Sequence, residues 1–389
     1  MPPNNTLRSQ RIHIGIFGTR NAGKSSLINA ITGQNTAIVS PQKGTTTDPV
    51  YKSMELIPVG PVVLIDTAGI DDDDPITGEQ RIQKTKEILR KTDIAILVTA
   101  PESQGKLTPH DQALIALFEK QNIKHLVVNN TENPSGSGEV NAKTAQNIEA
   151  IKSAIIARVG TPEKAQPLIA DKLSPGDMVV LVVSIDEAAP KGRLILPQQQ
   201  TIRDILSVDA VPIIAQLSNL QQVITAIKPT LIITDSQIFK EVATIAPASI
   251  PLTSFSIIMA RQKGFLAEAV QAASIIDSLQ TGDKVLIAEG CTHHKQCDDI
   301  GTVKIPRMIT AKTGHTPDYT FTSGGEFPED VADFKLIIHC GSCMLNQKEV
   351  TSRKNIAIDA NTPITNYGVA ISHMQGILPR CINIFKENF

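Results

Sequence analysis

Glycine, lysine and serine residues near the start of the chain have the spacing of a phosphate-binding loop. The run "GTRNAGKS" fits the pattern G-x4-G-K-S, and it lies between an alternating apolar run, "RIHIGIF", and a run of helical periodicity, "KSSLINAIT". In this context a glycine-rich loop lets backbone N–H groups surround phosphates at a helix N-terminus. The predicted contacts are Gly18, Gly23, Lys24, Ser25 and Ser26, with Lys24 on the outer phosphates and the Ser25 hydroxyl on Mg²⁺.

Two later motifs supply what such a loop needs for phosphate chemistry. The apolar run "VVLIDTAG" ends in Asp66, which is placed to hold Mg²⁺ through water, and in Gly69, whose N–H can reach the γ-phosphate. The threonine-rich run "KGTTTDP" offers a hydroxyl to the metal, with Thr46 as the first choice and Thr45 or Thr47 as alternatives. The loop lysine, the first-choice threonine, the aspartate and the glycine form the predicted catalytic set.

A second group of chemically competent residues lies near the other end of the chain. The run "AEGCTHHKQC" holds two cysteines and two histidines, and the later run "HCGSC" adds a histidine and two cysteines. Both runs follow apolar, strand-like segments, so the thiols are expected to converge on one metal. The candidate ligands are Cys291, His293, His294, Cys297, His339, Cys340 and Cys343.

Two kinds of metal site fit these ligands. Zinc takes a closed tetrahedron such as Cys291, His293, Cys340 and Cys343. An iron–sulfur cluster uses the three thiolates Cys291, Cys340 and Cys343, with a histidine or an exogenous group on the fourth iron. The chemistry of the residues leaves both open, with Cys297 as a bystander or a spare ligand. The C-x3-C-x2-C spacing of radical-SAM enzymes is absent from the sequence.

Alternating strands and helices must position these residues. Four apolar runs predict strands: "RIHIGIFG", "VVLIDTAG", "DIAILVTA" and "HLVVNN". Two runs predict helices: "QRIQKTKEILRK" and "NIEAIKSAIIARVG". This alternation is typical of a doubly wound α/β domain. After the linker-like run "GTPEKAQP", the runs "DMVVLVVSID", "RLILP", "AVPIIA" and "TLIITD" predict short strands, and "QQQTIRDILS" and "LQQVITAIK" predict helices. We therefore expect three α/β domains, at residues 1–160, 161–260 and 261–389.

Composition limits the class of protein. The 389 residues are 41% hydrophobic, carry 37 Lys+Arg against 39 Asp+Glu, and include no tryptophan. Without a basic patch or stacking aromatics, the chain is not expected to bind nucleic acid. The start "MPPNNTLRSQ" lacks an apolar segment, and no apolar run is long enough to cross a bilayer, so we expect a cytoplasmic protein with no membrane partner. In that compartment, cysteines favour metal chemistry over disulfides.

Residues 10 to 160 resemble the guanine-nucleotide-binding domains of translation-factor-related GTPases, such as Era, TrmE and FeoB. Such domains read guanine with N-K-x-D, and this chain has "NNTE" at residues 129–132, at the end of the expected strand. The later S-A-K loop appears as "NAK" at residues 141–143. The resemblance therefore implies GTP and GDP as ligands in preference to ATP. The implied base-binding residues are Asn129, Glu132, Ala142 and Lys143.

The same resemblance bears on the mechanism of hydrolysis. Ile70 follows "DTAG" where Ras-type domains have a water-orienting glutamine, so that mechanism is not available. Asn21 is the fourth residue of the phosphate loop, where some of these GTPases use asparagine to hold K⁺ and so add positive charge to the transition state. We expect slow intrinsic hydrolysis with K⁺ stimulation, typical of a switch. The acidic run Asp71 to Asp74 is expected to be a solvated loop.

Over nearly its whole length the chain resembles the HydF family, the [FeFe]-hydrogenase maturation GTPases. The resemblance rests on the GTPase motifs combined with "CTHH" and "HCGSC", and on the runs "GTTTDPVYK", "PKGRLILPQQQTIRD" and "CDDIGTVKIPR". It implies a scaffold or carrier that receives a diiron precursor, made with the radical-SAM maturases HydE and HydG, and delivers it to apo-[FeFe]-hydrogenase. The implied [4Fe–4S] ligands are Cys291, Cys340 and Cys343, with His294, His293 and then His339 as candidates for the fourth position.

The middle domain shows no catalytic cluster, so we interpret it as a homodimerisation domain that pairs through its sheet; a dimer of dimers is also allowed. The C-terminal domain is then the cluster-binding domain. The alternative function, from another class, is an RNA- or ribosome-associated GTPase with a structural zinc site. The balanced charge and the few aromatic residues weigh against it.

Overall fold

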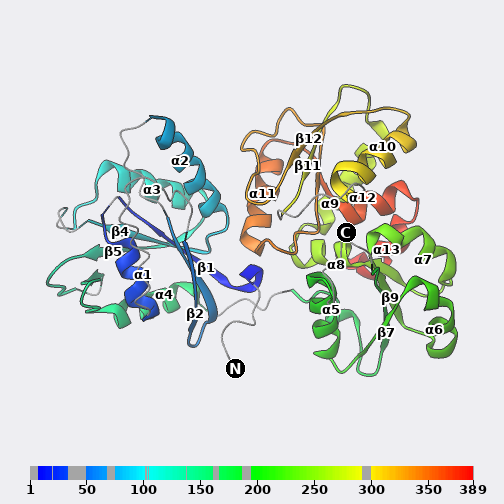
Figure 1. The fold of residues 1–389 in the computed structure, drawn as a ribbon, viewed down its shortest axis with the longest axis horizontal. Helices are drawn as coiled ribbons and strands as arrows, with labels where there is room; N and C mark the ends of the chain where they lie inside the picture. Colours follow the sequence, from blue (N-terminus) through cyan, green and yellow to red (C-terminus); the bar gives the residue numbers. More distant parts are fainter. Residues whose placement is uncertain are drawn as a thin grey trace. The chain divides into compact units, whose positions relative to one another are not determined.

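The computed structural model describes residues 8–19, 21–33, 50–67, 75–100, 103, 105–136, 138–160, 166–185, 194–290 and 299–388, with the side chains of 75–82 and 388 excepted (Figure 1). The chain forms two compact units. The first comprises residues up to 164 together with 346–349, and the second comprises 165–345 together with the residues from 350 onward. None of the described helices is long and apolar enough to cross a membrane.

The first unit is a six-stranded sheet of order β2-β3-β1-β4-β5-β6, parallel except for β2, which runs antiparallel to β3. Its strands are β1 Ile12–Phe17, β2 Val50–Leu56, β3 Gly60–Asp66, β4 Ile94–Thr99, β5 Lys124–Asn130 and β6 Glu139–Val140. Its helices are α1 Lys24–Thr32, α2 Pro75–Arg90, α3 Pro109–Lys120 and α4 Ile148–Val159.

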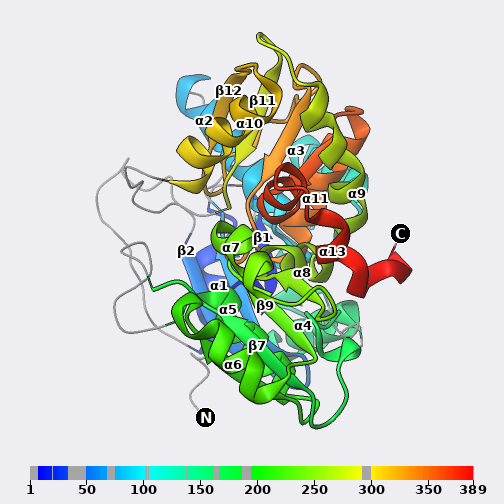
Figure 2. The same ribbon diagram turned by 90° about the vertical axis from the view of Figure 1, so that its right-hand side faces the viewer.

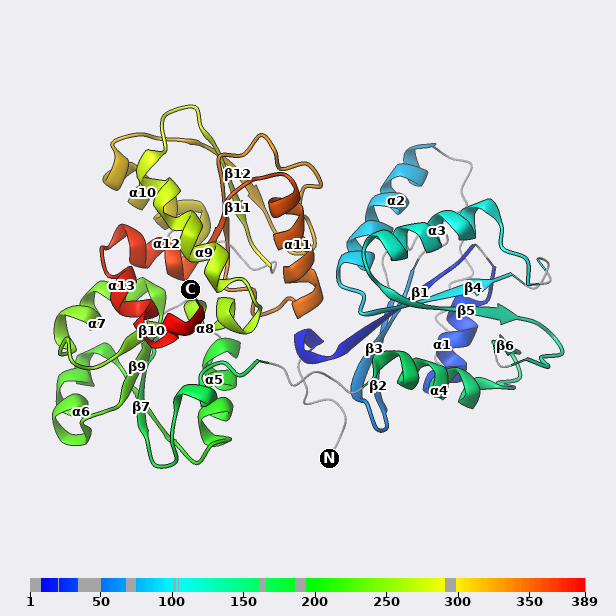
Figure 3. The ribbon, with the colours of Figure 1, turned by 180° about the vertical axis from the view of Figure 1, so that it is seen from behind.

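Helices cover both faces of this sheet (Figure 3). One apolar core lies between the sheet and α1 with α4, and the other lies between the sheet and α2 with α3. Burial on both faces explains why every residue of β4 is buried and apolar or threonine. Helix α3 begins with a capping box between Thr108 and Asp111. The doubly wound α/β domain predicted from the sequence is thus present.

The second unit holds two four-stranded parallel sheets, of order β10-β9-β7-β8 and β12-β11-β13-β14. The strands are β7 Met178–Val182, β8 Val211–Ala215, β9 Leu231–Thr234, β10 Leu252–Ser254, β11 Lys284–Ala288, β12 Asp318–Thr322, β13 Leu336–His339 and β14 Ile364–Asn366. The helices are α5 Leu196–Leu206, α6 Leu220–Ile227, α7 Phe239–Ile245, α8 Phe255–Gln262, α9 Leu266–Ala273, α10 Ile305–Thr313, α11 Gln347–Asp359, α12 Tyr367–Met374 and α13 Leu378–Ile382. Figure 2 turns this unit toward the viewer.

Most elements expected in the middle of the chain are present, with one correction. The helices predicted from "QQQTIRDILS" and "LQQVITAIK" are α5 and α6. The run "RLILP", predicted to be a strand, is not one among its described residues: its last two residues open α5 instead. The reason is local. Pro197 takes the second helical position, where a backbone N–H has no partner within the helix, so the missing N–H of proline costs no hydrogen bond.

The two sheets of the second unit share one topology, so this unit contains a structural repeat. In the first repeat (β7 to α8), Val182 pairs with Ala215 on one side and with Thr234 on the other. In the second repeat (β11 to α12), Ala288 takes the same position between β12 and β13. Each repeat opens on a similar sequence, "LSPGDMVVLVV" and then "LQTGDKVLIAE", in which the glycine has a positive φ.

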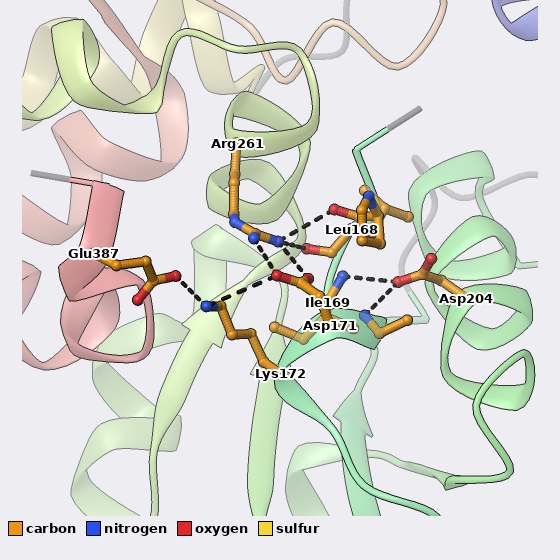
Figure 4. A network of polar contacts seen from close by, with 9 residues as sticks. Leu168, Ile169, Asp171, Lys172, Asp204, Arg261 and Glu387 are labelled. Atoms are coloured by element: carbon orange, nitrogen blue, oxygen red, sulfur yellow. Dashed lines mark hydrogen bonds and ion pairs between the residues drawn. The ribbon is translucent and has the colours of Figure 1, made fainter. Parts of the chain in front are cut away.

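A buried arginine fixes the beginning of the second unit (Figure 4). Arg261, from α8, donates to both oxygens of Asp171 at 2.8 and 2.5 Å and to the carbonyl oxygen of Leu168 at 3.2 Å. Lys172 forms an ion pair with Glu387, from the 3-10 helix Asn383–Asn388. The network therefore ties three segments that are distant in sequence.

Candidate functional site

The phosphate-binding loop joins β1 to α1 with two glycines that cannot be replaced. Gly18 has φ +138°, and a Cβ there would lie 2.2 Å from the carbonyl oxygen of Val98. Gly23 has φ +93°, and a Cβ there would lie 2.2 Å from Nδ2 of Asn130. Helix α1 begins at Lys24, and its cap residue is this second glycine, which has no side chain to bond the first-turn N–H groups. Such a helix start suits an anion.

The loop lysine lies over the loop itself. The Lys24 ammonium donates to the carbonyl oxygens of Gly18 and Thr19, both at 2.7 Å, and the side chain is 8% exposed. A buried ammonium held at the mouth of the loop is placed to bind the outer phosphates of a nucleotide. Asn21 has a left-handed backbone, φ 61°, and an exposed side chain, while Ser26 is half-buried in the first turn of α1.

The predicted magnesium ligands come together from two elements. Ser25, in the first turn of α1, donates its hydroxyl to Oδ2 of Asp66, the last residue of β3, at 2.5 Å. Burial raises the pKa of Asp66, while the Ser25 bond and the nearby Lys24 charge act in the opposite direction. A hydroxyl and a carboxylate are oxygen donors that suit Mg²⁺. Thr46 and Gly69 lie outside the described residues.

Asn130, the residue after the predicted Asn129, contacts the phosphate loop. Its Nδ2 donates to the carbonyl oxygen of Ala22 at 2.9 Å, and its Oδ1 accepts the N–H of Ala142 at 3.2 Å. Asn129 accepts instead from the Thr99 hydroxyl at 3.2 Å. Because consecutive residues of a strand point to opposite faces, only one of the two asparagines can reach the loop. The geometry therefore assigns the bridging role one position later than the motif alignment.

The two loops expected at the base are joined by another asparagine. Asn141 accepts the N–H groups of Lys143 and Thr144 at 3.1 Å each, and its Nδ2 donates to the carbonyl oxygen of Glu132 at 2.9 Å. The side chains of Glu132 and Lys143 are exposed. The structure thus places Glu132, Ala142 and Lys143 in one connected pair of loops beside the phosphate loop, whereas Asn129 lies on β5 and bonds Thr99.

In the second unit, Cys340 lies at the end of β13, directly beside the end of β11. Its Sγ accepts the N–H groups of Gly290 at 3.0 Å and of Ser342 at 3.4 Å. Ala288 pairs with His339, so the loops that carry the predicted thiolates leave the sheet at the same level. The strand order reverses here, because β12 and β13 lie on opposite sides of β11, and such switch points are where open α/β sheets bind ligands.

Two buried cations lie near the thiols. Burial raises the pKa of Cys343 to about 11 and also raises that of Cys340. The Lys263 ammonium donates to the carbonyl oxygen of Leu345 at 2.8 Å, and its charge and that of the Cys343 thiolate stabilise each other. Arg353, which is fully buried, stabilises the Cys340 thiolate in the same way. Burial holds the thiols protonated until a metal displaces the protons.

His339, one of the predicted fourth ligands, uses both ring nitrogens within the protein. Nε2 lies 3.1 Å from Nη1 of Arg353, and Nδ1 lies 3.0 Å from the carbonyl oxygen of Cys340. Burial, and next the arginine, lower the pKa of His339 to about 3, so the ring is neutral. With Nε2 accepting from the arginine and Nδ1 donating to the carbonyl, neither nitrogen faces a metal. This favours His294 or His293 for the fourth position.

The other half of the predicted metal site is not described. Cys291, His293, His294 and Cys297 lie outside the described residues. Within the part that is described, no group of three or more His, Cys, Asp or Glu side chains is arranged to hold a metal ion. The described half nevertheless fits a thiophilic, negatively charged group, because it offers soft sulfur donors, backbone N–H groups aimed at sulfur, and buried positive charge.

Sequence reasoning missed Lys263 and Arg353. Lys263 follows a helix in an unremarkable run, and Arg353 occupies one position of a polar-looking helix, so neither carried a motif. The strand register of the two repeats makes Cys340 the counterpart of Asp235, because each residue directly follows the partner of the equivalent central strand. Ser184 donates its N–H to Asp235 at 2.9 Å, just as Gly290 donates to Cys340.

Comparison with known families identifies the chain. Residues 168–264 match the hydrogen maturase F dimerization domain, and residues 267–384 match the hydrogen maturase F tetramerization domain. The chain belongs to the hydrogen maturase F (HydF) family. Residues 13–131 match the 50S ribosome-binding GTPase family, so this member of the HydF family carries a P-loop GTPase domain at its N-terminal end.

Individual curated relatives match this member of the HydF family over part of its length. The tRNA modification GTPase MnmE of Dichelobacter nodosus is 32% identical over 170 residues, which are 40% of this chain and 36% of the relative. GTPase Der of Campylobacter concisus is 38% identical over 125 residues, 31% of this chain and 26% of the relative. The chain therefore spans about a third or less of the length of these curated relatives.

Solved structures similar to this HydF-family chain include a single-residue variant of Aquifex aeolicus Era bound to GDP·AlF₄⁻, at 18% identity and a TM-score of 0.34, covering 52% of this chain and 92% of that one. The G domain of the T. maritima FeoB iron transporter matches at 19% identity and a TM-score of 0.22, over 39% of this chain and all of that one.

Proposed function

We propose that this HydF-family protein hydrolyses GTP in its first unit and carries a [4Fe–4S] cluster in its second, as a scaffold that passes a diiron precursor to apo-[FeFe]-hydrogenase. The observation that carries the proposal is the Cys340 thiol, which accepts two backbone N–H bonds at a switch point of the sheet; buried Lys263 bonds the Leu345 carbonyl of the same loop. Such N–H bonds to sulfur are among the means by which proteins tune iron–sulfur clusters.

Family membership supports the hydrogenase-related role, and the chemistry of the site supports the cargo. Cys291, Cys340 and Cys343 would hold three irons of the cluster, which supplies an open iron at which a precursor can attach. A weak fourth ligand, His294 or His293, would be displaced more easily than a thiolate. The radical-SAM maturases HydE and HydG are the proposed sources of the precursor.

In the GTPase unit, the chain's own residues bind and orient the nucleotide. Lys24 and the α1 N-terminus would contact the phosphates, and Ser25 with Asp66 would hold Mg²⁺, which stabilises charge on the phosphates. Asn21 is the proposed K⁺ contact and Thr46 and Gly69 are the proposed switch contacts. We expect slow hydrolysis that rises with K⁺, and we expect nucleotide state to alter docking of the partners.

The test is the iron, zinc and sulfide content of protein purified without oxygen, beside a Cys340→Ser/Cys343→Ser variant. We expect about four irons and four sulfides per chain, lost in the variant. A Lys24→Ala variant serves as the matched control, because it should lose GTP hydrolysis and keep the cluster. One zinc without sulfide, also lost in the double variant, would reject the carrier function and favour a GTPase with a structural zinc site.

A further inference from the structure

Lys263 is a buried lysine without a carboxylate partner among the described residues. It follows α8, its side chain is 7% exposed, and its Nζ donates to the Leu345 carbonyl oxygen. No ion pair joins it to an aspartate or glutamate within the described ranges. An unpaired ammonium in an apolar interior is costly, since burial removes the water that stabilises its charge. Such a residue needs a negative group beside it.

The negative group belongs to the thiol site. A Cys343 thiolate would stabilise the Lys263 ammonium, and Cys343 lies two positions before the carbonyl that accepts from the lysine. Leu345 itself packs over Gly290, where an added Cβ would lie 2.7 Å from its Cγ. The lysine therefore bonds the segment that follows Cys343 and packs against Gly290, at the end of β11.

Other charges near the site are already engaged. Arg353 donates to the Gly324 carbonyl oxygen at 2.5 Å and lies against Nε2 of His339. The buried Glu289 accepts from the Tyr367 hydroxyl at 3.0 Å and places negative charge near Cys340. At Cys340, the negative charge of Glu289 and the positive charge of Arg353 shift the pKa of the thiol in opposite directions. Lys263 is the cation that interacts with Cys343.

We propose that the Lys263 ammonium balances the negative charge of a thiolate-bound iron–sulfur cluster and so raises the reduction potential of that cluster. The inference rests on the proposed cluster. A cluster bound by thiolates is an anion, and reduction by one electron, supplied in a titration by an external reductant, adds one further negative charge. A nearby buried ammonium stabilises the reduced form more than the oxidised form.

The experiment is an EPR-monitored redox titration of the full-length protein with its cluster, comparing wild type with Lys263→Met and Lys263→Arg. Lys354→Met is the matched control. Lys354 also donates to a backbone carbonyl, of Gly264 at 3.0 Å, but its charge is paired with Glu268 at 3.1 Å. We expect the methionine variant at Lys263 to shift to a more negative potential, and the arginine variant and the control to match the wild type.

Each outcome decides the matter. If Lys263→Met loses the cluster while Lys263→Arg keeps it, the charge is needed to hold the anion, which supports the proposal. A methionine variant with full iron content and an unchanged potential overturns it. Loss of the cluster from both variants also overturns it, because shape and not charge would then be decisive. A wild-type protein without iron and sulfide would instead reject the proposed function.

Discussion

At the scale of single residues, the asparagine that connects the nucleotide loops is Asn130. It bonds Ala22 in the phosphate loop and Ala142 in the base loop, whereas Asn129 bonds Thr99 on the other face of β5. The motif alone could not distinguish two adjacent asparagines, because spacing does not show which face of a strand a residue occupies. The partner atoms supply that information.

Replacing Asn130 with alanine should therefore weaken nucleotide binding more than replacing Asn129. Two hydrogen bonds that fix separate loops are lost, each with a net contribution of about 1 kcal/mol, so we expect the Kd for GDP to rise by about tenfold or more. Titration calorimetry of GDP with both variants measures this. Equal affinity of the Asn130→Ala and Asn129→Ala proteins would contradict the assignment.

At the scale of elements, the sequence predicts the order of strands and helices better than it predicts which residues form each element. The apolar strands of the first unit and helices α5 and α6 were foreseen, since each carries a clear period of burial. The prediction of a strand at "RLILP" was wrong, because a proline at the second position of a helix cannot be told in sequence from a proline after a strand. The repeat was overlooked because little more than a Gly-Asp pair and apolar alternation is shared between the two openings.

The same limit applies to the predicted metal site. Cysteine and histidine spacing predicts Cys340 and Cys343 as ligands, but it cannot show that His339 uses both ring nitrogens on Arg353 and on the Cys340 carbonyl. Nor can the spacing predict that Lys263, which directly follows α8, donates to the carbonyl oxygen of Leu345 near Cys343. Contacts between segments distant in sequence are set by packing, which a linear pattern does not record.

The network around Arg261 should contribute to the stability of the second unit. Arg261→Met leaves Asp171 and the Leu168 carbonyl without their donor. Because the Asp171 side chain is 35% exposed, we expect the free energy of unfolding to fall by about 1.5–3 kcal/mol. Lys172→Met is the control, because its partner Glu387 is largely exposed and such pairs contribute about 0–1 kcal/mol. Urea unfolding followed by circular dichroism gives both values. An equal loss of unfolding free energy in the two variants would contradict the prediction that Arg261 contributes more than Lys172.

At the scale of the whole molecule, the two repeats present equivalent edge strands. Among the described strands, β8 and β12 each have one neighbour in their sheet, and each carries exposed apolar residues: Val211 and Ile214 on β8 are 47% and 49% exposed, and Phe321 on β12 is 40% exposed. An apolar edge is a site where another chain can add its own strand. The two regions match dimerization and tetramerization domains, so these edges are candidates for the two assembly contacts.

A charge on each edge should separate the two contacts. We expect Ile214→Lys to prevent dimerisation and Phe321→Lys to limit assembly to the dimer, since a lysine at an edge opposes strand pairing. Light scattering coupled to size-exclusion chromatography gives the mass of each variant. Ile358→Lys is the control, because Ile358 is as exposed as Ile214, at 49%, but lies on helix α11 and not on a strand. Wild-type mass in both edge variants would show that the chains assemble through other surfaces.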